Sequence, residues 1–173
     1  MPEQQTLRRA RRDKREGKSA STQAGEFVRE EIHHIRQGKH GARNSRQAIA
    51  IGLSKARRAG VELAPPAEGR TSESTVRKAR RDYARGHGAS PQRKVTARRR
   101  RASEQALERE PRESASPRAL ANQARAAAGR LGPGERASAA RKAAKTKGPA
   151  QRSSAARKAA RTRGARRGSS MHA

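Results

Sequence analysis

Lysine and arginine are the most numerous residues of this chain with a side chain that can bind a charged partner. The 173 residues include 44 Lys and Arg against 15 Asp and Glu, which gives a formal net charge of +29. A charge of this size disfavours compaction and attracts polyanions. Each phosphate that a cation neutralises on a nucleic acid releases counterions, which favours binding. We therefore expect a nucleic-acid partner, with DNA preferred to RNA, bound largely without regard to its base sequence.

The cations that we expect to contact phosphates fall into four groups along the chain. They are Arg46, Lys55, Arg57 and Arg58; Arg77, Lys78, Arg80 and Arg81; Arg98, Arg99, Arg100 and Arg101; and, near the C-terminus, Arg141, Lys142, Lys145, Lys147, Arg157, Lys158, Arg161, Arg163, Arg166 and Arg167. Arg46, Arg57 and Arg58 could enter a groove of DNA as a helix-turn-helix does. The connection before them is not diagnostic of that motif, so contacts to phosphates are the favoured interpretation.

Histidines and glutamates near residue 33 are the one group that suggests a metal site. His33 and His34 lie close in sequence to Glu30 and Glu31, and His40 follows. Adjacent residues of a helix point about 100° apart, so neighbouring histidines seldom share an ion. We expect partly exposed histidines and no metal.

Residues suited to catalysis or to base stacking are few. No serine or threonine is accompanied by an obvious oriented base, no phosphate-binding glycine motif occurs, and cysteine is absent. We expect no enzymatic activity and no cofactor. Phe27 and Tyr83 are too few for a platform that stacks unpaired bases, although RNA binding by shape and charge survives this objection.

Bulky apolar residues, which must position these groups, gather in one stretch. Nine of the sixteen Val, Ile, Leu, Phe and Tyr residues lie within residues 21–64. Their spacing predicts a helix that starts at Ser21 or Thr22 and stops at Gly38. A second helix should run from an Asn44 cap to Gly60. We expect a mainly α fold with a small helical hairpin core, marginal in stability alone, over which Val61 and Leu63 fold back.

The second helix has two expected faces. Ile49, Leu53 and Ala56 should face the first helix. The cations of the first group, Arg46, Lys55, Arg57 and Arg58, should reach outward.

Basic segments, helical or disordered, flank residues 21–64. Residues 1–20 form a basic arm with a short helix that has no apolar face to bury, and residues 65–132 form basic helical segments with linkers. Residues 133–173 form a tail rich in Ala, Lys and Arg, in which SAARKAAKTKG at 138–148 returns as SAARKAARTRG at 154–164. With so little to bury, the tail is expected to be disordered when free and to become helical as phosphates neutralise it.

A resemblance to a known family rests on three stretches of residues 20–64. These are STQAGEFVREEI, the KHG-type link and NSRQAIAIGLSKA. Residues 20–64 resemble a family of small bacterial basic domains of unknown function, found in proteins labelled DNA-binding. The tail resembles linker histones and histone-like bacterial proteins in composition. The likeness implies nucleic-acid binding and supplies no catalytic or contact residues.

These observations lead to one principal hypothesis and two alternatives. No apolar run is long enough for a membrane span and no secretory signal is visible, so we expect a cytoplasmic protein at the bacterial nucleoid. The principal hypothesis is a non-enzymatic, histone-like DNA-binding protein. The alternatives are an RNA- or ribosome-associated basic protein, and a module that forms a homodimer through its hairpin. The residues proposed for that dimer contact are Phe27, Ile32, Ile35, Ile49 and Leu53.

Overall fold

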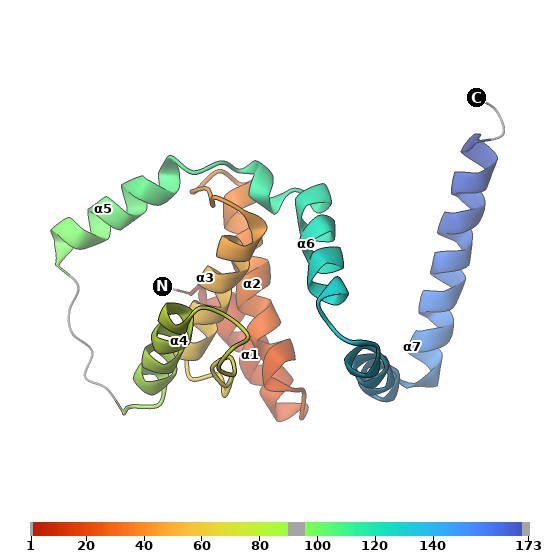
Figure 1. The fold of residues 1–173 in the computed structure, drawn as a ribbon, viewed down its shortest axis with the longest axis horizontal. Coiled ribbons are helices and arrows are strands. Elements are labelled where there is room, and N and C mark those ends of the chain that lie inside the picture. Colours follow the sequence, from red (N-terminus) through yellow and green to blue (C-terminus); the bar gives the residue numbers. More distant parts are fainter. Residues whose placement is uncertain (1, 90–95, 171–173) are drawn as a thin grey trace. The chain divides into compact units, whose positions relative to one another are not determined.

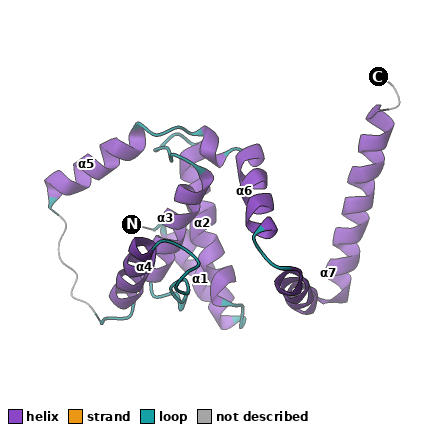
Figure 2. Ribbon diagram, in the orientation of Figure 1, coloured by secondary structure: helices purple, strands orange, loops and turns teal. Residues whose placement is uncertain are grey.

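A computed structural model describes residues 2–89 and 96–170, apart from the side chains of residues 145–147 and 165–170. In these ranges every regular element is a helix, which confirms the mainly α class (Figures 1 and 2). The helices are α1 (Gln4–Arg15), α2 (Ala20–Arg36), α3 (Ser45–Arg58), α4 (Glu73–Gly86), α5 (Ala97–Glu108), the 3-10 helix η1 (Glu113–Ala115), α6 (Pro117–Gly129) and α7 (Pro133–Ser170). The chain divides into two compact units, residues 1–123 and residues 124–173.

The predicted hairpin is formed by α2 and α3, and its second helix is capped as expected. The Oδ1 atom of Asn44 accepts a hydrogen bond from the Gln47 N–H at 3.0 Å. The Gln47 side chain in turn accepts one from the Arg43 N–H at 2.9 Å. Helix α2 starts slightly earlier than predicted, because Ser19 is its cap and accepts from the Thr22 N–H.

The face that α3 turns toward α2 differs from the prediction. Ala48 and Gly52 are buried there together with Ala56, which was predicted to face inward, whereas Ile49 and Leu53 are only partly buried. A Cβ atom added at Gly52 would lie 2.6 Å from the Cα atom of Val28. Small residues allow the two helix backbones to approach closely, so the tight crossing is made by them rather than by the bulky pair.

The core extends beyond residues 21–64. One apolar cluster joins Ala10 of α1 to Phe27, Ala56 and Val61, with Leu63 packed beside it. Val61 and Leu63 therefore fold back as predicted. Helix α1 buries a face through Thr6, Ala10 and Asp13, although the sequence led us to expect none. The difference arises because small side chains three and four residues apart, with Leu7 packed beside them, are enough for α1 to pack against another helix.

The end of α5 and the segment that follows it are fixed over the link between α2 and α3. The Gly41 N–H donates to the Leu107 carbonyl at 2.8 Å, and the Ala42 N–H donates to the Pro111 carbonyl at 3.0 Å. The Arg36 Nε–H donates to the Ala115 carbonyl at 2.8 Å. Ala115 also joins Ile32, Ile35, Ala42 and Ala48 in a second apolar cluster. Residues 107–115 thus belong to the folded unit.

The tail is helical, where the sequence predicts disorder in the free chain. Helix α7 is broken at Gly148, whose φ of 66° is accessible to glycine, and Pro149 follows. Its described side chains are mostly exposed and none is buried, so alanine's high helix propensity is the physical reason for this helix. Within the described ranges, no helix combines the length and apolar character needed to cross a membrane.

Candidate nucleic-acid interface

Two cations of α3 were predicted to reach outward but point into the folded unit. The Lys55 Nζ atom lies 2.6 Å from the Oε2 atom of Glu31, and the Lys55 side chain is 18% exposed. Arg57 is buried and donates to the carbonyl oxygens of Leu63 at 3.1 Å and Ala64 at 3.3 Å. Burial lowers the pKa of Arg57, and the negative charge of Asp82 opposes that shift. Lys55 and Arg57 thus stabilise the folded unit instead of presenting charge to a partner.

The other two predicted cations of α3 lie at the surface. Arg46 is exposed, and its Nε–H donates to the Oε1 atom of Gln123 at 3.2 Å. The Arg58 Nε atom lies 3.7 Å from the Oδ1 atom of Asp82, and the Arg58 side chain is 47% exposed. Helix α3 therefore lacks the row of outward cations that a groove-reading helix would need.

Helix α4 has one buried face, which fixes the direction of its cations. Val76 and Ala79 are buried, and α4 packs against α3. An added Cβ atom at Gly86 would meet the Arg57 carbonyl oxygen, so the end of α4 lies directly against the end of α3. The remaining faces of α4 are directed toward solvent.

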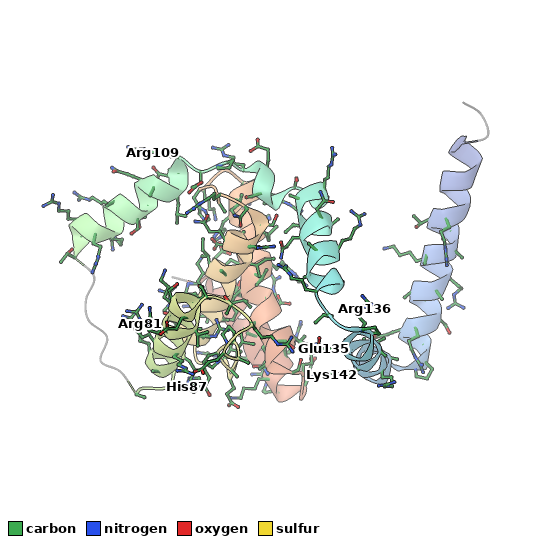
Figure 3. All side chains as sticks on the ribbon, viewed as in Figure 1. Arg81, His87, Arg109, Glu135, Arg136 and Lys142 are labelled. Carbon is green, nitrogen blue, oxygen red and sulfur yellow. The ribbon has the colours of Figure 1, made fainter. Side chains whose placement is uncertain are left out.

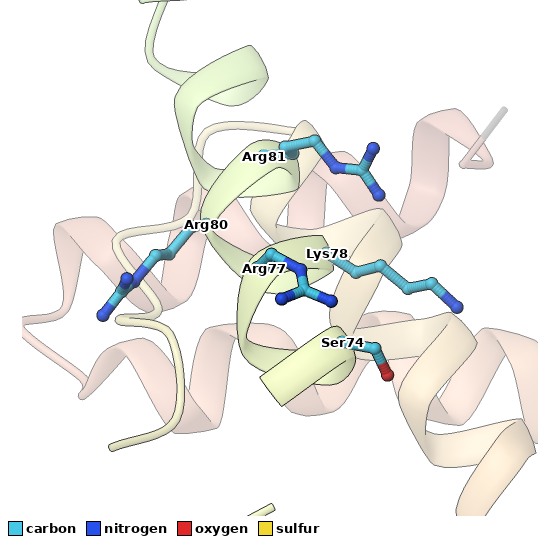
Figure 4. A pocket seen from close by; sticks show the side chains of 5 residues that line it. All are labelled: Ser74, Arg77, Lys78, Arg80 and Arg81. Carbon is cyan, nitrogen blue, oxygen red and sulfur yellow. The ribbon is translucent and has the colours of Figure 1, made fainter. Parts of the chain in front are cut away.

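The predicted cations of α4 are all exposed but differ in their partners. Arg77, Lys78, Arg80, Arg81 and Ser74 line a shallow hollow of about 390 Å³. Arg80 leaves the helix on the side opposite to Lys78 (Figure 4) and lies 2.7 Å from Glu68. Arg77 pairs with Glu73 one turn earlier. Lys78 and Arg81 have no hydrogen-bond or ion-pair partner among the described residues, so they are the α4 cations most available to phosphate.

Helix α5 presents its four arginines without burying any residue. The Nε atom of Arg100 lies 3.8 Å from the Oε1 atom of Glu104, with both side chains well exposed. In the described part of the chain, Arg98, Arg99 and Arg101 have no side-chain partner. An exposed ion pair of this kind contributes little and is easily exchanged for a phosphate contact. The whole run is accessible.

The predicted cations of the tail are also exposed where their side chains are described (Figure 3). These are Arg141, Lys142, Arg157, Lys158, Arg161 and Arg163. Arg163 donates to the Ala159 carbonyl one turn earlier, at 3.4 Å. The side chains of Lys145, Lys147, Arg166 and Arg167 lie outside the described residues.

Phe27 and Tyr83 do not form an exposed stacking surface. Phe27 is fully buried in the first apolar cluster. Tyr83 stacks on His87, with the ring centroids 4.0 Å apart. Unpaired bases would therefore find few aromatic faces.

Acidic residues inside the folded unit form a feature that the sequence reading missed. Glu30 and Glu31 are buried, the latter completely. Glu31 stands between Phe27 and Ile35 at four-residue spacing, and this position on the apolar stripe was the signal that could have revealed it. His34 and His40 lie beside Glu31, whereas His33 is exposed. The structure thus brings together two of the three histidines considered above.

No family model matches this chain, and the searches of curated proteins and of solved structures find no significant match. The resemblance of residues 20–64 to small bacterial basic domains therefore stays a prediction.

Proposed function

We propose that this chain is a non-enzymatic, largely sequence-nonspecific DNA-binding protein of histone-like type, acting at the bacterial nucleoid. One observation supports this most. The acids within the folded unit engage cations such as Lys55, whereas the arginine run of α5 and the described cations of α7 are exposed with few acidic partners. Exposed cations bind phosphate by releasing counterions, and they need no fixed surface shape to do so.

Weak base specificity follows from the state of α3. Arg57, on which a groove-reading arrangement would depend, is buried and bonded to backbone carbonyls. Contacts to phosphate position a protein on DNA without reading its sequence. We therefore expect similar affinity for duplexes of different sequence and equal length.

The primary test is a binding titration over a series of salt concentrations. Fluorescence anisotropy with a labelled duplex is expected to give an affinity that falls steeply as salt rises, with a slope of about −0.9 per neutralised phosphate on a logarithmic plot. An affinity that does not change with salt would contradict the proposal. A structured RNA as competitor at one ionic strength tests the RNA-associated alternative, and a strong preference for RNA would favour it.

Most of the residues proposed for the homodimer contact are not accessible to a second chain. Phe27, Ile32 and Ile35 are buried within a single chain. Only Ile49 and Leu53 of the proposed set are partly exposed. Sedimentation of the full chain in the absence of DNA tests this alternative, and we expect a monomer.

A double substitution on α4 tests the most available cations of the folded unit. Replacement of Lys78 and Arg81 by Gln should reduce the salt slope by about 2, because each lost phosphate contact accounts for about one unit. The measurement is the same anisotropy titration.

A charge-matched control removes Arg12 and Lys14 instead. Their side chains already pair with Glu16 at 3.7 Å and Glu62 at 3.0 Å. The hydrogen bond from Lys14 holds the pKa of Glu62 below its usual value, which is consistent with that pairing. This control should reduce the salt slope less than replacement of Lys78 and Arg81 does. Equal losses in both variants would mean that net charge alone, and not the α4 surface, determines binding.

A further inference from the structure

We infer that Glu31, His34 and His40 form a binding site for a divalent transition-metal ion of the zinc type. Each residue offers one ligand atom, and these atoms all lie within 4.8 Å of one another. Glu31 and His34 lie one turn apart on α2, and His40 comes from the link between α2 and α3. An ion held by all three would therefore tie the link to the helix.

Glu31 is the residue that points most directly to a missing ligand. Its side chain is 1% exposed, and the Oε2 atom lies 2.6 Å from the Lys55 Nζ atom. The Oε1 atom is buried without a hydrogen-bond partner. The nearest imidazole nitrogen, Nε2 of His40, is 3.4 Å away. A buried carboxylate oxygen without a partner is unfavourable, and a metal ion would satisfy it.

The two histidines have the outer hydrogen bonds that metal-binding histidines commonly show. The Nδ1 atom of His40 lies 3.0 Å from the Gly41 carbonyl oxygen, so Nδ1–H donates and the lone pair of neutral imidazole is on Nε2. The Nε2 atom of His34 lies 2.8 Å from the Oε1 atom of Glu3. Coordination through Nδ1 of His34 would leave that bond in place and create a carboxylate–histidine–metal arrangement.

The donor set selects the class of ion. Two imidazoles and one carboxylate suit zinc, cobalt or nickel, whereas calcium and magnesium favour sites made of oxygen ligands. Three protein ligands leave a fourth position for water. The positive charges of Lys55 and Lys39 are nearby, but Glu3, Glu30 and Glu31 supply negative charge in the same cluster. The site can therefore accept a cation although the chain as a whole is strongly basic.

The test uses the full chain and the metal ion alone. Isothermal titration with Zn²⁺ in the absence of DNA should give one site per chain, and binding should raise the melting temperature. Titration with Co²⁺ should give visible absorption bands typical of nitrogen ligation at low coordination number. His40→Gln should weaken Zn²⁺ binding at least about tenfold and remove the Co²⁺ bands.

His33→Gln is the matched control, because His33 is exposed on the same helix and outside the cluster. It should bind Zn²⁺ like the unmodified chain. If His40→Gln fails to fold by circular dichroism, Glu31→Gln tests the same site and should also lose the ion. Absence of binding in the unmodified chain, or equal weakening by His33→Gln and His40→Gln, would overturn the inference. Neither result bears on DNA binding, which is measured without added metal.

Discussion

Deletion of residues 134–173 is expected to produce the largest loss of DNA affinity of any change to this chain. The deletion removes twelve Lys and Arg residues and one acid, Glu135. If every removed cation contacts a phosphate, the salt slope falls by up to about 11, at about 0.9 per contact. The effect is measured as the change in slope between the full chain and the shortened chain in an anisotropy titration.

A scrambled tail is the control for this deletion. It keeps the composition and length of residues 134–173 but destroys the repeat of 138–148 at 154–164. Because the proposed contacts depend on charge, the scrambled chain should retain most of the affinity and the slope. An unchanged slope after deletion would contradict a role for the tail, and a scrambled chain as weak as the deletion would show that the repeat itself is recognised.

Gly52→Ala adds a single methyl group but is expected to lower the free energy of unfolding strongly. The new Cβ atom would lie 2.6 Å from the Cα and 2.9 Å from the N atom of Val28. These are backbone atoms, so α2 and α3 must separate. Overpacking of this kind costs about 3 kcal/mol and the gain in helix propensity returns about 1 kcal/mol. The free energy of unfolding, from urea titration monitored by circular dichroism, should therefore fall by about 2 kcal/mol.

Gly25→Ala makes the same chemical change on the partner helix in open space. A Cβ atom at Gly25 meets nothing within 4 Å. This variant should raise the free energy of unfolding by about 0.5–1 kcal/mol through helix propensity alone. Equal effects of the two substitutions would show that α2 and α3 are not in close contact in solution.

Local signals in the sequence predicted the helices well. Asn44 caps α3 as expected, and its side chain accepts from the Gln47 N–H. Val61 and Leu63 return to the core as expected. These features depend on residues a few positions apart, so periodicity and capping chemistry are sufficient to predict them.

Features that depend on distant partners were not predictable in the same way. The prediction of the inward face of α3 was wrong, because hydrophobicity favours Ile49 at this face. The close approach of Val28 instead requires Gly52 there. Arg57 was assigned to the surface because nothing near it in sequence shows that it binds the carbonyls of Leu63 and Ala64. The same holds for the candidate interface: sequence identifies the cations, and only the fold separates those held internally from those exposed.

The interruption at Gly148 and Pro149 has a consequence for how much duplex one molecule would cover. Residues 133–147 make a rod of about 22 Å at 1.5 Å per residue, which spans about 6 base pairs at 3.4 Å each. Residues 150–170, after the interruption, make a second and longer rod of about 32 Å. At saturation, each molecule should contact DNA with one rod of its tail. When the protein is diluted, both rods should bind, so the length of DNA covered by each tail should increase in two steps.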